Sequence, residues 1–551
     1  SNQRRTEVLG DTAMHKKGKL ELTWVGKYDE EKPVEPRILL EDTEKSYGDP
    51  GSENMLIHGD NLIALQALQQ DFVGKIKCIY IDPPYNTGSA FEYYDDDVEH
   101  SIWLSLMRKR LLLLHSLLAD DGFLCCHIDD SESHYLKVVL DEIFGRSNYL
   151  TSLYIRVRYP DKTLKSDMDF HKEIEQVLVY RKSSEATPNF DYDEVGYAKF
   201  IYAIEELGTG KEITLGGKKV TVFDKSEYKI IKKAEGDEYG LKEIWATGTI
   251  LDGNSSGRFF RDYINGRYEE DGYGVLYKVY GIGDDRYDYR YFTGPKRQGA
   301  TKGKYYQGVP IDKLESEIIE RKKPIGGFYD LAGSFGNCRH EGGVEFRSGK
   351  KPEALIEMII RYFSDKNDWV LDSFLGSGST TATAHKMSRR WIGIEMGDHA
   401  YTLCKVRMDN VINGDKTGIS QKVNWQGGGG YHFYELAPSL LVKNDKLPVY
   451  QINPTYTFEM LCEAICKIEG FKYKPQDVFH GHSSEKRFIH VTTEFVNAEY
   501  IRSLSQHLDE GQSLLIYATK IQSDMMLPDN IEVKKIPKDL LDKCNFESEV
   551  R

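Results

Sequence analysis

Short apolar runs alternate with amphipathic stretches over residues 54–184 and again from about residue 350. The runs KIKCIYID, GFLCCHID and IEQVLVYRK are almost continuously apolar, which is typical of strands buried on both faces of a sheet. Between the first two runs, residues 101–118 place large apolar side chains at helical spacing. The alternation predicts an α/β fold with a parallel or mostly parallel sheet covered by helices on both faces.

The pattern changes between residues 185 and 335, where Gly and Tyr are frequent and few clean helices are predicted. We interpret this stretch as an inserted β-rich or irregular domain that divides the α/β domain into halves at 54–184 and 336–425. Residues 1–53 are rich in charged residues and contain only short apolar runs, as expected of an arm that lies on the surface. After QGGGG, which predicts a hinge or a tight backbone passage, a small α/β domain is predicted at 431–551.

Composition narrows the class of protein. A chain of 551 residues with 40% hydrophobic and 29% charged residues is typical of a globular protein of two or three domains. No apolar run approaches the ~18–20 residues that span a bilayer, and the N-terminus has no apolar signal region. We therefore expect a cytoplasmic protein without a membrane partner.

The eight cysteines are scattered without a CxxC pair, which indicates buried reduced thiols and no metal site. The formal net charge of −14 disfavours a generally basic nucleic-acid-binding protein. Over residues 196–325, however, Lys and Arg slightly outnumber Asp and Glu, which leaves room for a local basic surface.

The segment DSFLGSGST places a Gly-rich turn between a strand that ends in Asp372 and a helix. Gly376 and Gly378 would let the backbone approach a ligand, although a purely structural tight turn explains them equally well. The segment lacks the third glycine of a dinucleotide fingerprint, where Thr381 stands, and the chain has no Walker A motif. Glu395 ends the next strand, where an acid can accept hydrogen bonds from ribose hydroxyls. Together these residues predict an adenosine-type ligand, and S-adenosylmethionine is compatible with them.

A second site is predicted at IDPPYNTG, where a buried strand ends in Asp82. Pro83 and Pro84 restrict the backbone, so that Asp82 and Tyr85 would be held in place. The carboxylate and a neighbouring carbonyl can accept both protons of an exocyclic amine while Tyr85 stacks on the base. The chain has no Pro-Cys dipeptide, the nucleophile motif expected for methylation at cytosine C5.

These motifs carry a family resemblance. DPPY followed by D-x-F-x-G-S-G resembles the β-class amino-methyltransferases of DNA, in which the catalytic motif precedes the cofactor motif and target recognition is inserted between them. The extended DPPYNTG, LTWVGK near the N-terminus and GGGGYHFYEL resemble the modification (Mod) subunits of type III restriction–modification systems. The resemblance implies a Rossmann-like S-adenosylmethionine-dependent methyltransferase fold and adenine-N6 methylation, with target recognition at 185–335.

Residue roles follow from the resemblance position by position. The catalytic residues would be Asp82, Pro83, Pro84 and Tyr85. The cofactor-binding residues would be Asp60, Lys351, Asp372, Phe374, Gly376, Gly378 and Glu395.

The target adenine would have to be swung out of double-stranded DNA to reach this site. Within the inserted domain, the expected DNA contacts are Arg258, Arg261, Arg267, Lys296, Arg297, Lys302 and Lys304. We expect most tyrosines of this domain to serve packing.

The resemblance and the spare C-terminal domain favour a homodimer joined through 431–551, and a separate restriction subunit would supply ATP-driven cleavage. Two alternatives stay open, namely a cytosine-N4 methyltransferase and a DNA-binding specificity subunit without methylase activity. Asp82 favours adenine over cytosine, since the cytosine-N4 motif more often begins with Ser.

Overall fold

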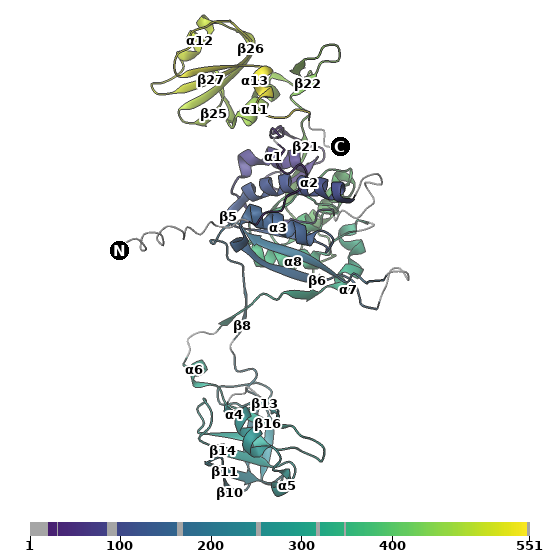
Figure 1. Ribbon diagram of the computed structural model, residues 1–551, viewed down its shortest axis with the longest axis vertical. Helices are drawn as coiled ribbons and strands as arrows, with labels where there is room; N and C mark the ends of the chain where they lie inside the picture. The colour runs from purple at the N-terminus through teal and green to yellow at the C-terminus, as the bar shows by residue number, and fades with distance from the viewer. Residues whose placement is uncertain are drawn as a thin grey trace, which may run out of the picture. The chain divides into compact units, whose positions relative to one another are not determined.

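The computed structural model describes residues 20–29, 31–84, 96–161, 169–194, 196–249, 255–315, 320–346 and 349–547. The chain forms two compact units, Phe190–Ile325 and the remainder on either side of it, Ser1–Asn189 with Gly326–Arg551. Each unit has its own sheets and apolar core (Figure 1).

The larger unit is built on a mixed sheet with the strand order β1-β21-β3-β20-β19-β4-β5-β7-β6-β18. From β21 to β5 neighbouring strands are parallel, whereas β7 is antiparallel to both β5 and β6. The expectation of a mostly parallel sheet is therefore confirmed. The strands are β1 Leu39–Glu41, β3 Met55–His58, β4 Ile76–Ile81, β5 Leu118–Ile128, β6 Tyr149–Arg156, β7 Ile174–Arg181, β18 Phe328–Asp330, β19 Trp369–Asp372, β20 Arg390–Glu395 and β21 Gly430–Leu436.

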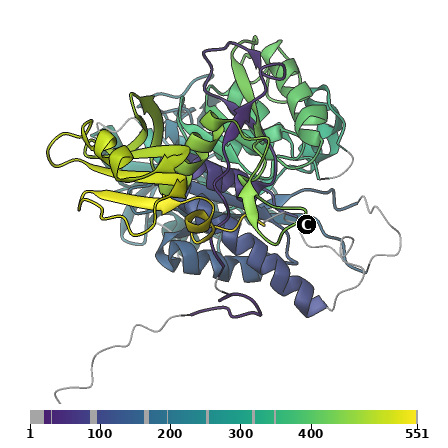
Figure 2. The same ribbon diagram turned by 90° about the horizontal axis from the view of Figure 1, so that it is seen from above.

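Helices cover both faces of this sheet. On one face, α1 Asn61–Phe72, α2 Asp96–Leu117 and α3 Ser133–Phe144 share an apolar core with alternate strand residues such as Ile79 and Ile81. On the other face lie α8 Glu353–Phe363, α9 Ser379–Lys386 and α10 Lys405–Ile412, and Phe123 packs against Phe363. The purple-to-blue and green helices form separate layers in Figure 1 and Figure 2. The sheet is thus buried on both sides, as the apolar runs predict.

The order of strands determines where the predicted motifs meet. β4 and β19 are hydrogen-bonded neighbours and run parallel, with Cys78 opposite Val370 and Ile79 opposite Leu371. Parallel neighbours end at the same edge of a sheet, so Asp82 after β4 and Asp372 at the end of β19 emerge side by side. This places the DPPY turn next to the Gly-rich turn although the two are far apart in the sequence.

The segment after the Gly run does not begin the C-terminal domain at residue 431. Its first strand, β21, instead pairs with β3 in the main sheet, and β1 of the N-terminal arm adds to its outer edge. Gly430 is a tight backbone passage, because a Cβ atom there would lie 2.4 Å from the Asp49 nitrogen.

Beyond β21, the C-terminal part of the larger unit has its own sheet in the order β24-β25-β26-β27-β28. Its apolar core involves α11 and residues of β26 and β27, and Glu35 of the N-terminal arm accepts hydrogen bonds from Ser439 and the Leu440 amide. The elements are α11 Phe458–Glu469, β24 Lys472–Gln476, β25 Phe479–Ser484, β26 Arg487–Val496, α12 Ala498–Ser505, β27 Ser513–Ile521 and β28 Ile531–Lys535.

The smaller unit, Phe190–Ile325, contains an antiparallel sheet in the order β10-β11-β14-β15-β16-β13. The helix α4 Ser255–Phe259 and the π-helical turn after it pack on one face, and the two-stranded antiparallel sheet of β9 Tyr202–Glu206 and β12 Tyr228–Lys232 packs on the other. Several tyrosines, among them Tyr277, Tyr291 and Tyr306, are buried in these cores, as expected. The strands are β10 Lys211–Leu215, β11 Lys218–Phe223, β13 Lys242–Ala246, β14 Leu276–Tyr280, β15 Tyr289–Thr293 and β16 Gly303–Gln307.

All eight cysteines are free and buried, which confirms the expectation of reduced thiols. Among the described helices, none is both long enough and apolar enough to cross a lipid bilayer.

Candidate active site

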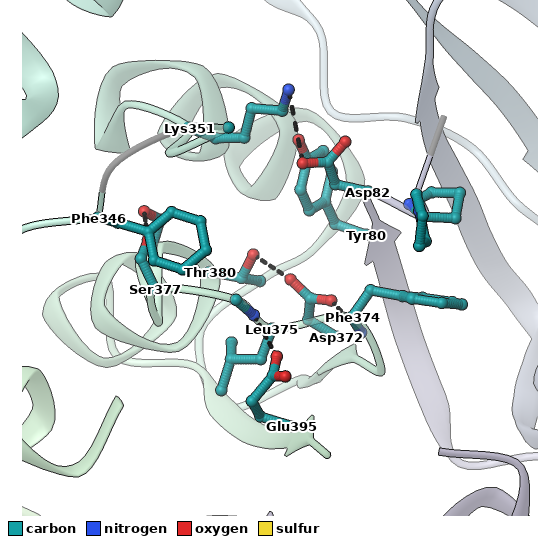
Figure 3. A pocket seen from close by; sticks show the side chains of 15 residues that line it. Tyr80, Asp82, Phe346, Lys351, Asp372, Phe374, Leu375, Ser377, Thr380 and Glu395 are labelled. Atoms are coloured by element: carbon teal, nitrogen blue, oxygen red, sulfur yellow. Dashed lines mark hydrogen bonds and ion pairs between the residues drawn. The ribbon is translucent and has the colours of Figure 1, made fainter. Parts of the chain in front are cut away.

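A cleft of about 470 Å³ opens at the edge of the main sheet where β4, β19 and β20 end. Both predicted motifs contribute to its lining, and Figure 3 shows their side chains around one space. The lining residues are Tyr80, Asp82, Pro83, Pro84, Phe346, Gly349, Lys351, Asp372, Phe374, Leu375, Gly376, Ser377, Ser379, Thr380 and Glu395.

The first wall of the cleft is the turn that follows β4. Pro83 and Pro84 restrict its backbone, and the carbonyl oxygen of Pro84 accepts a hydrogen bond from Trp103 Nε1 at 2.9 Å. Trp103 comes from α2, so a core helix anchors the turn that carries Asp82. Tyr85, predicted to stack on the base, lies outside the described residues.

The second wall is the Gly-rich turn between β19 and α9. Gly376 has φ of 59° and Gly378 has φ of 83°, a conformation that favours glycine. The Gly376 amide donates to Glu395 Oε2 at 2.7 Å, which joins the turn to the end of β20. Gly378 precedes α9 and faces Cys404 and Arg407, so it shapes the turn from behind and does not line the cleft.

Asp372 lies in the cleft wall but is 2% exposed. Its Oδ2 accepts from the Thr380 hydroxyl at 2.6 Å, and its Oδ1 accepts from the Phe374 amide at 2.9 Å. Burial, together with the nearby carboxylates of Asp82 and Glu395, raises the pKa of Asp372 to about 7 against these two hydrogen bonds. Asp372 therefore holds the Gly-rich turn together from within.

Lys351 lies directly opposite Asp82 (Figure 3). Its Nζ is 3.4 Å from Asp82 Oδ2 and 3.1 Å from Glu175 Oε2, and its side chain is 7% exposed. Behind it, His127 Nε2 lies 2.5 Å from the same Glu175 oxygen, and Tyr80 OH lies 2.9 Å from His127 Nδ1. Sequence reasoning missed His127 and Glu175, although each is a polar residue next to the apolar run of its strand.

Asp60, predicted to bind the cofactor, is the N-cap of α1. Its Oδ1 accepts from the amides of Leu62 and Ile63 at 2.8 Å and 3.3 Å, and its Oδ2 lies 3.5 Å from an Arg110 nitrogen. Asp60 is absent from the cleft lining, although the adjacent Asn61 donates to the Ser373 carbonyl at 2.8 Å. The structure thus brings the GDN turn beside the Gly-rich turn but assigns the Asp60 side chain to helix capping.

The lining fits a cationic nucleoside. Its charged side chains are the acids Asp82, Asp372 and Glu395 and a single base, Lys351. An excess of carboxylates suits a positively charged group, while Phe346 and Phe374 supply apolar surface for a ring. Phe346 was not predicted from the sequence, because it lies in a loop without a recognisable pattern.

Of the seven basic residues predicted to contact DNA, three form ion pairs within the smaller unit and four are exposed. Arg261 pairs with Asp262 at 2.7 Å, Arg267 pairs with Asp271 at 2.8 Å, and Lys304 pairs with Glu243 at 2.5 Å. The exposed ones are Arg258, Lys296, Arg297 and Lys302.

Three of these exposed residues lie on the loop between β15 and β16. An aromatic side chain that the sequence did not single out, Trp245, lies nearby on β16's partner strand β13. It is 63% exposed, with Lys304 Nζ 4.4 Å from the centre of its ring. This corner of the smaller unit combines exposed positive charge with an exposed ring.

Comparison with known proteins gives a consistent result. Residues 76–406, more than half of the chain, match a family model described as DNA methylase. The chain is 32% identical over 454 residues to the probable type III restriction-modification enzyme HindVI Mod subunit of Haemophilus influenzae, covering 77% of this chain and 59% of that protein.

Two further relatives are more distant. The StyLTI Mod subunit of Salmonella typhimurium is 27% identical, with coverage of 64% and 52%, and the EcoPI Mod subunit of Escherichia phage P1 is 25% identical, with coverage of 67% and 59%. The chain therefore spans between half and two thirds of the length of each of these relatives.

Proposed function

Because the chain belongs to the DNA methylase family, we propose that it is a sequence-specific DNA adenine-N6 methyltransferase. The observation that carries the proposal is the common cleft formed by the Asp82 turn and the Gly-rich turn. A carboxylate positioned to accept from an amine and a turn suited to a nucleoside are the two parts that amino-methylation requires.

S-adenosylmethionine, the methyl donor of this family, supplies an activated methyl group. Glu395 Oε2 accepts from the Gly376 amide at 2.7 Å and Oε1 from the Gly397 amide at 3.4 Å, and each oxygen keeps a lone pair with which Glu395 would accept from the ribose hydroxyls. Phe346 and Phe374 would contact its apolar surface, and the Gly376 backbone would approach it closely.

Asp82 would act on the acceptor amine of the target base. A carboxylate that accepts one N6–H increases electron density on nitrogen and stabilises the positive charge that develops during attack. The Pro84 carbonyl already accepts from Trp103, so the Pro83 carbonyl is the candidate acceptor for the second N6–H. After transfer, the amine loses one proton, and the Asp82 carboxylate is the nearest base to receive it.

The target base must leave the duplex to enter the cleft, which costs about a few kcal/mol of stacking and pairing free energy. We assign DNA contact to the exposed basic residues of the smaller unit, together with Trp245 as a stacking or wedge residue. Asp82 in place of Ser is the feature that favours adenine over cytosine.

The test of the proposal is expression in a host without endogenous methylation, followed by mapping of modified bases across the genome. We expect N6-methyladenine in one short motif and its loss, by at least about 100-fold in rate, in Asp82→Ala. Asp121→Ala, which alters an exposed aspartate of β5, is the matched control and should methylate normally.

Other outcomes would contradict the proposal in identifiable ways. N4-methylcytosine in the mapped motif would assign the cytosine-N4 reaction. Binding of DNA and S-adenosylmethionine without any modification would indicate a specificity subunit.

The similarity to Mod subunits supports a narrower proposal, that the chain is the modification subunit of a type III restriction–modification system. It would then act as a homodimer in contact through the C-terminal domain and bind a separate helicase–nuclease subunit. Sedimentation of the full chain is expected to show a dimer, and a monomer that methylates DNA would contradict this part.

A further inference from the structure

Behind Asp82, a series of polar side chains in successive contact extends from the cleft into the core. Lys351 Nζ contacts both Asp82 and Glu175, and Glu175 in turn contacts His127. His127 is 0% exposed and comes from β5, whereas Glu175 comes from β7, so two core strands hold the far end of the series. A carboxylate can only accept, so His127 Nε2 donates to Glu175, and with a neutral ring its Nδ1 accepts from Tyr80.

Within this series of polar side chains, negative charges outnumber positive ones. One ammonium group, Lys351, lies between two carboxylates, at 3.4 Å from Asp82 and 3.1 Å from Glu175. Because the ammonium is almost fully buried, its interaction with each carboxylate is weakly screened by solvent. The two carboxylates therefore share one positive charge, and the share that Asp82 receives depends on Glu175.

This sharing bears on the strength of Asp82 as an acceptor. A carboxylate that is fully paired with an ammonium is a weaker hydrogen-bond acceptor and a weaker base than one that is partly paired. Glu175, held by His127, draws Lys351 away from Asp82, so that the Asp82 carboxylate is less fully paired with the ammonium. Lys351 in turn places a positive charge between two partly buried carboxylates.

We infer that Glu175 is a positioning residue for methyl transfer, which acts through Lys351 on the charge and orientation of the Asp82 carboxylate. The inference rests on the proposed function, in which Asp82 accepts from the target amine. It also gives Lys351 a role different from the cofactor contact that the family resemblance implies.

The electrostatics of the neighbouring groups agree with this arrangement. Burial alone would lower the pKa of Lys351, but Asp82 and Glu175 outweigh it and raise that pKa. Burial alone would raise the pKa of Glu175, but His127 and Lys351 outweigh it and lower that pKa. The titratable and charged groups that face Asp82 from the surrounding elements are Tyr80 of β4, Cys126 of β5, Asp372 of β19 and Lys351 before α8.

The test uses single-turnover methylation by the full-length enzyme on duplex DNA that contains its mapped site, from about pH 4 to 9. In Glu175→Gln the whole positive charge of Lys351 acts on the Asp82 carboxylate. We expect the acid limb of the rate profile to move about 0.5–1 unit lower and the rate above it to fall about 3- to 30-fold. The KM for S-adenosylmethionine should stay within about twofold.

A second variant shifts the profile in the opposite direction. Lys351→Met removes the ammonium that lies between Asp82 and Glu175, which disfavours negative charge there and moves the acid limb to higher pH. A merely structural role would reduce activity in both variants without opposite shifts. Glu357→Gln, which removes an α8 carboxylate that lies 2.9 Å from Lys422 Nζ, is the matched control and should leave the limb in place.

Failure of this inference differs from failure of the proposed function. An active wild-type enzyme with an unshifted acid limb in Glu175→Gln, or with both variants shifted the same way, overturns the role of Glu175. A wild-type enzyme that methylates no adenine overturns the proposed function itself. If Glu175→Gln does not fold, the direction of the shift in Lys351→Met decides the question.

Discussion

At the scale of single residues, the cleft contains carboxyl groups with opposite tasks. Asp82 faces the space where a substrate amine would lie, whereas Asp372 uses both oxygens to hold the Thr380 hydroxyl and the Phe374 amide. Burial raises the pKa of Asp372 from its ordinary value of 3.8 to about 7. Between these two values the folded state keeps a proton that the unfolded chain has released, so the free energy of unfolding falls as the pH rises.

This linkage can be tested with Asp372→Asn, which keeps the shape of the side chain but cannot ionise. Relative to the wild type, the variant should become more stable as the pH rises from 5 to 7, by about 1.4 kcal/mol for each unit at most. Urea unfolding of both proteins at several pH values measures the difference, in which the titration of groups that do not interact with Asp372 cancels. A difference that is constant with pH would contradict the raised pKa of Asp372.

At the scale of elements, the site depends on strands that neighbour each other in space but not in sequence. The neighbouring strands β4 and β19 both contribute residues to the cleft lining. At the other side of the sheet, β21 pairs with β3. The passage into β21 is narrow, because a Cβ atom on Gly430 would approach the backbone of Asp49 and Tyr47 within 2.4–2.8 Å. β21 is therefore tied to the N-terminal arm on one side and to the core sheet on the other.

Gly430→Ala should force these backbones apart and lower the free energy of unfolding by about 1–3 kcal/mol, the usual cost of overpacking. Gly327→Ala is the matched control, since a Cβ atom there meets nothing within 4 Å. Thermal and urea unfolding of the two variants provide the comparison. Equal stability of the two would show that the passage into β21 has room for a side chain.

At the scale of the whole molecule, we propose that catalysis and DNA reading belong to different compact units. The cleft lies in the larger unit, and the exposed basic loop between β15 and β16 lies in the smaller one. Of the predicted DNA contacts, Arg267 is paired with two acids and is a poor candidate, at 2.8 Å from Asp271 and 3.0 Å from Glu270. Lys296, Arg297 and Lys302 are exposed and lie together.

Replacement of these three residues by alanine should weaken DNA binding at least about tenfold and reduce the slope of log affinity against log salt by up to about 3. The control replaces Lys225, Lys229 and Lys232, which are exposed in the same unit, and changes the net charge equally. Fluorescence anisotropy over a range of salt concentrations measures both effects. Equal loss in both triple variants would indicate a general effect of charge.

Which parts of the site the sequence could predict depends on how local their signals are. The periodicity of the sequence locates the ends of the buried strands. Asp82 and Gly376 come within a few residues after such ends, and Glu395 is itself the last residue of a strand. Lys351, Glu175 and His127 come together from distant segments, and each alone is an ordinary polar residue near an apolar run. For Asp60 the residue type alone does not separate a helix cap from a ligand contact, and the cofactor contact stays a prediction.

By itself, the sequence determined the class of fold, the two turns that form the cleft and the β-rich character of the inserted unit, because each depends on short-range periodicity and turn chemistry. Only the tertiary structure decided that β4 and β19 are neighbours, that β21 belongs to the main sheet and that Lys351 is shared between Asp82 and Glu175. Strand order and buried charge pairing arise from contacts between segments distant along the chain. No local pattern of hydrophobic and polar residues specifies them.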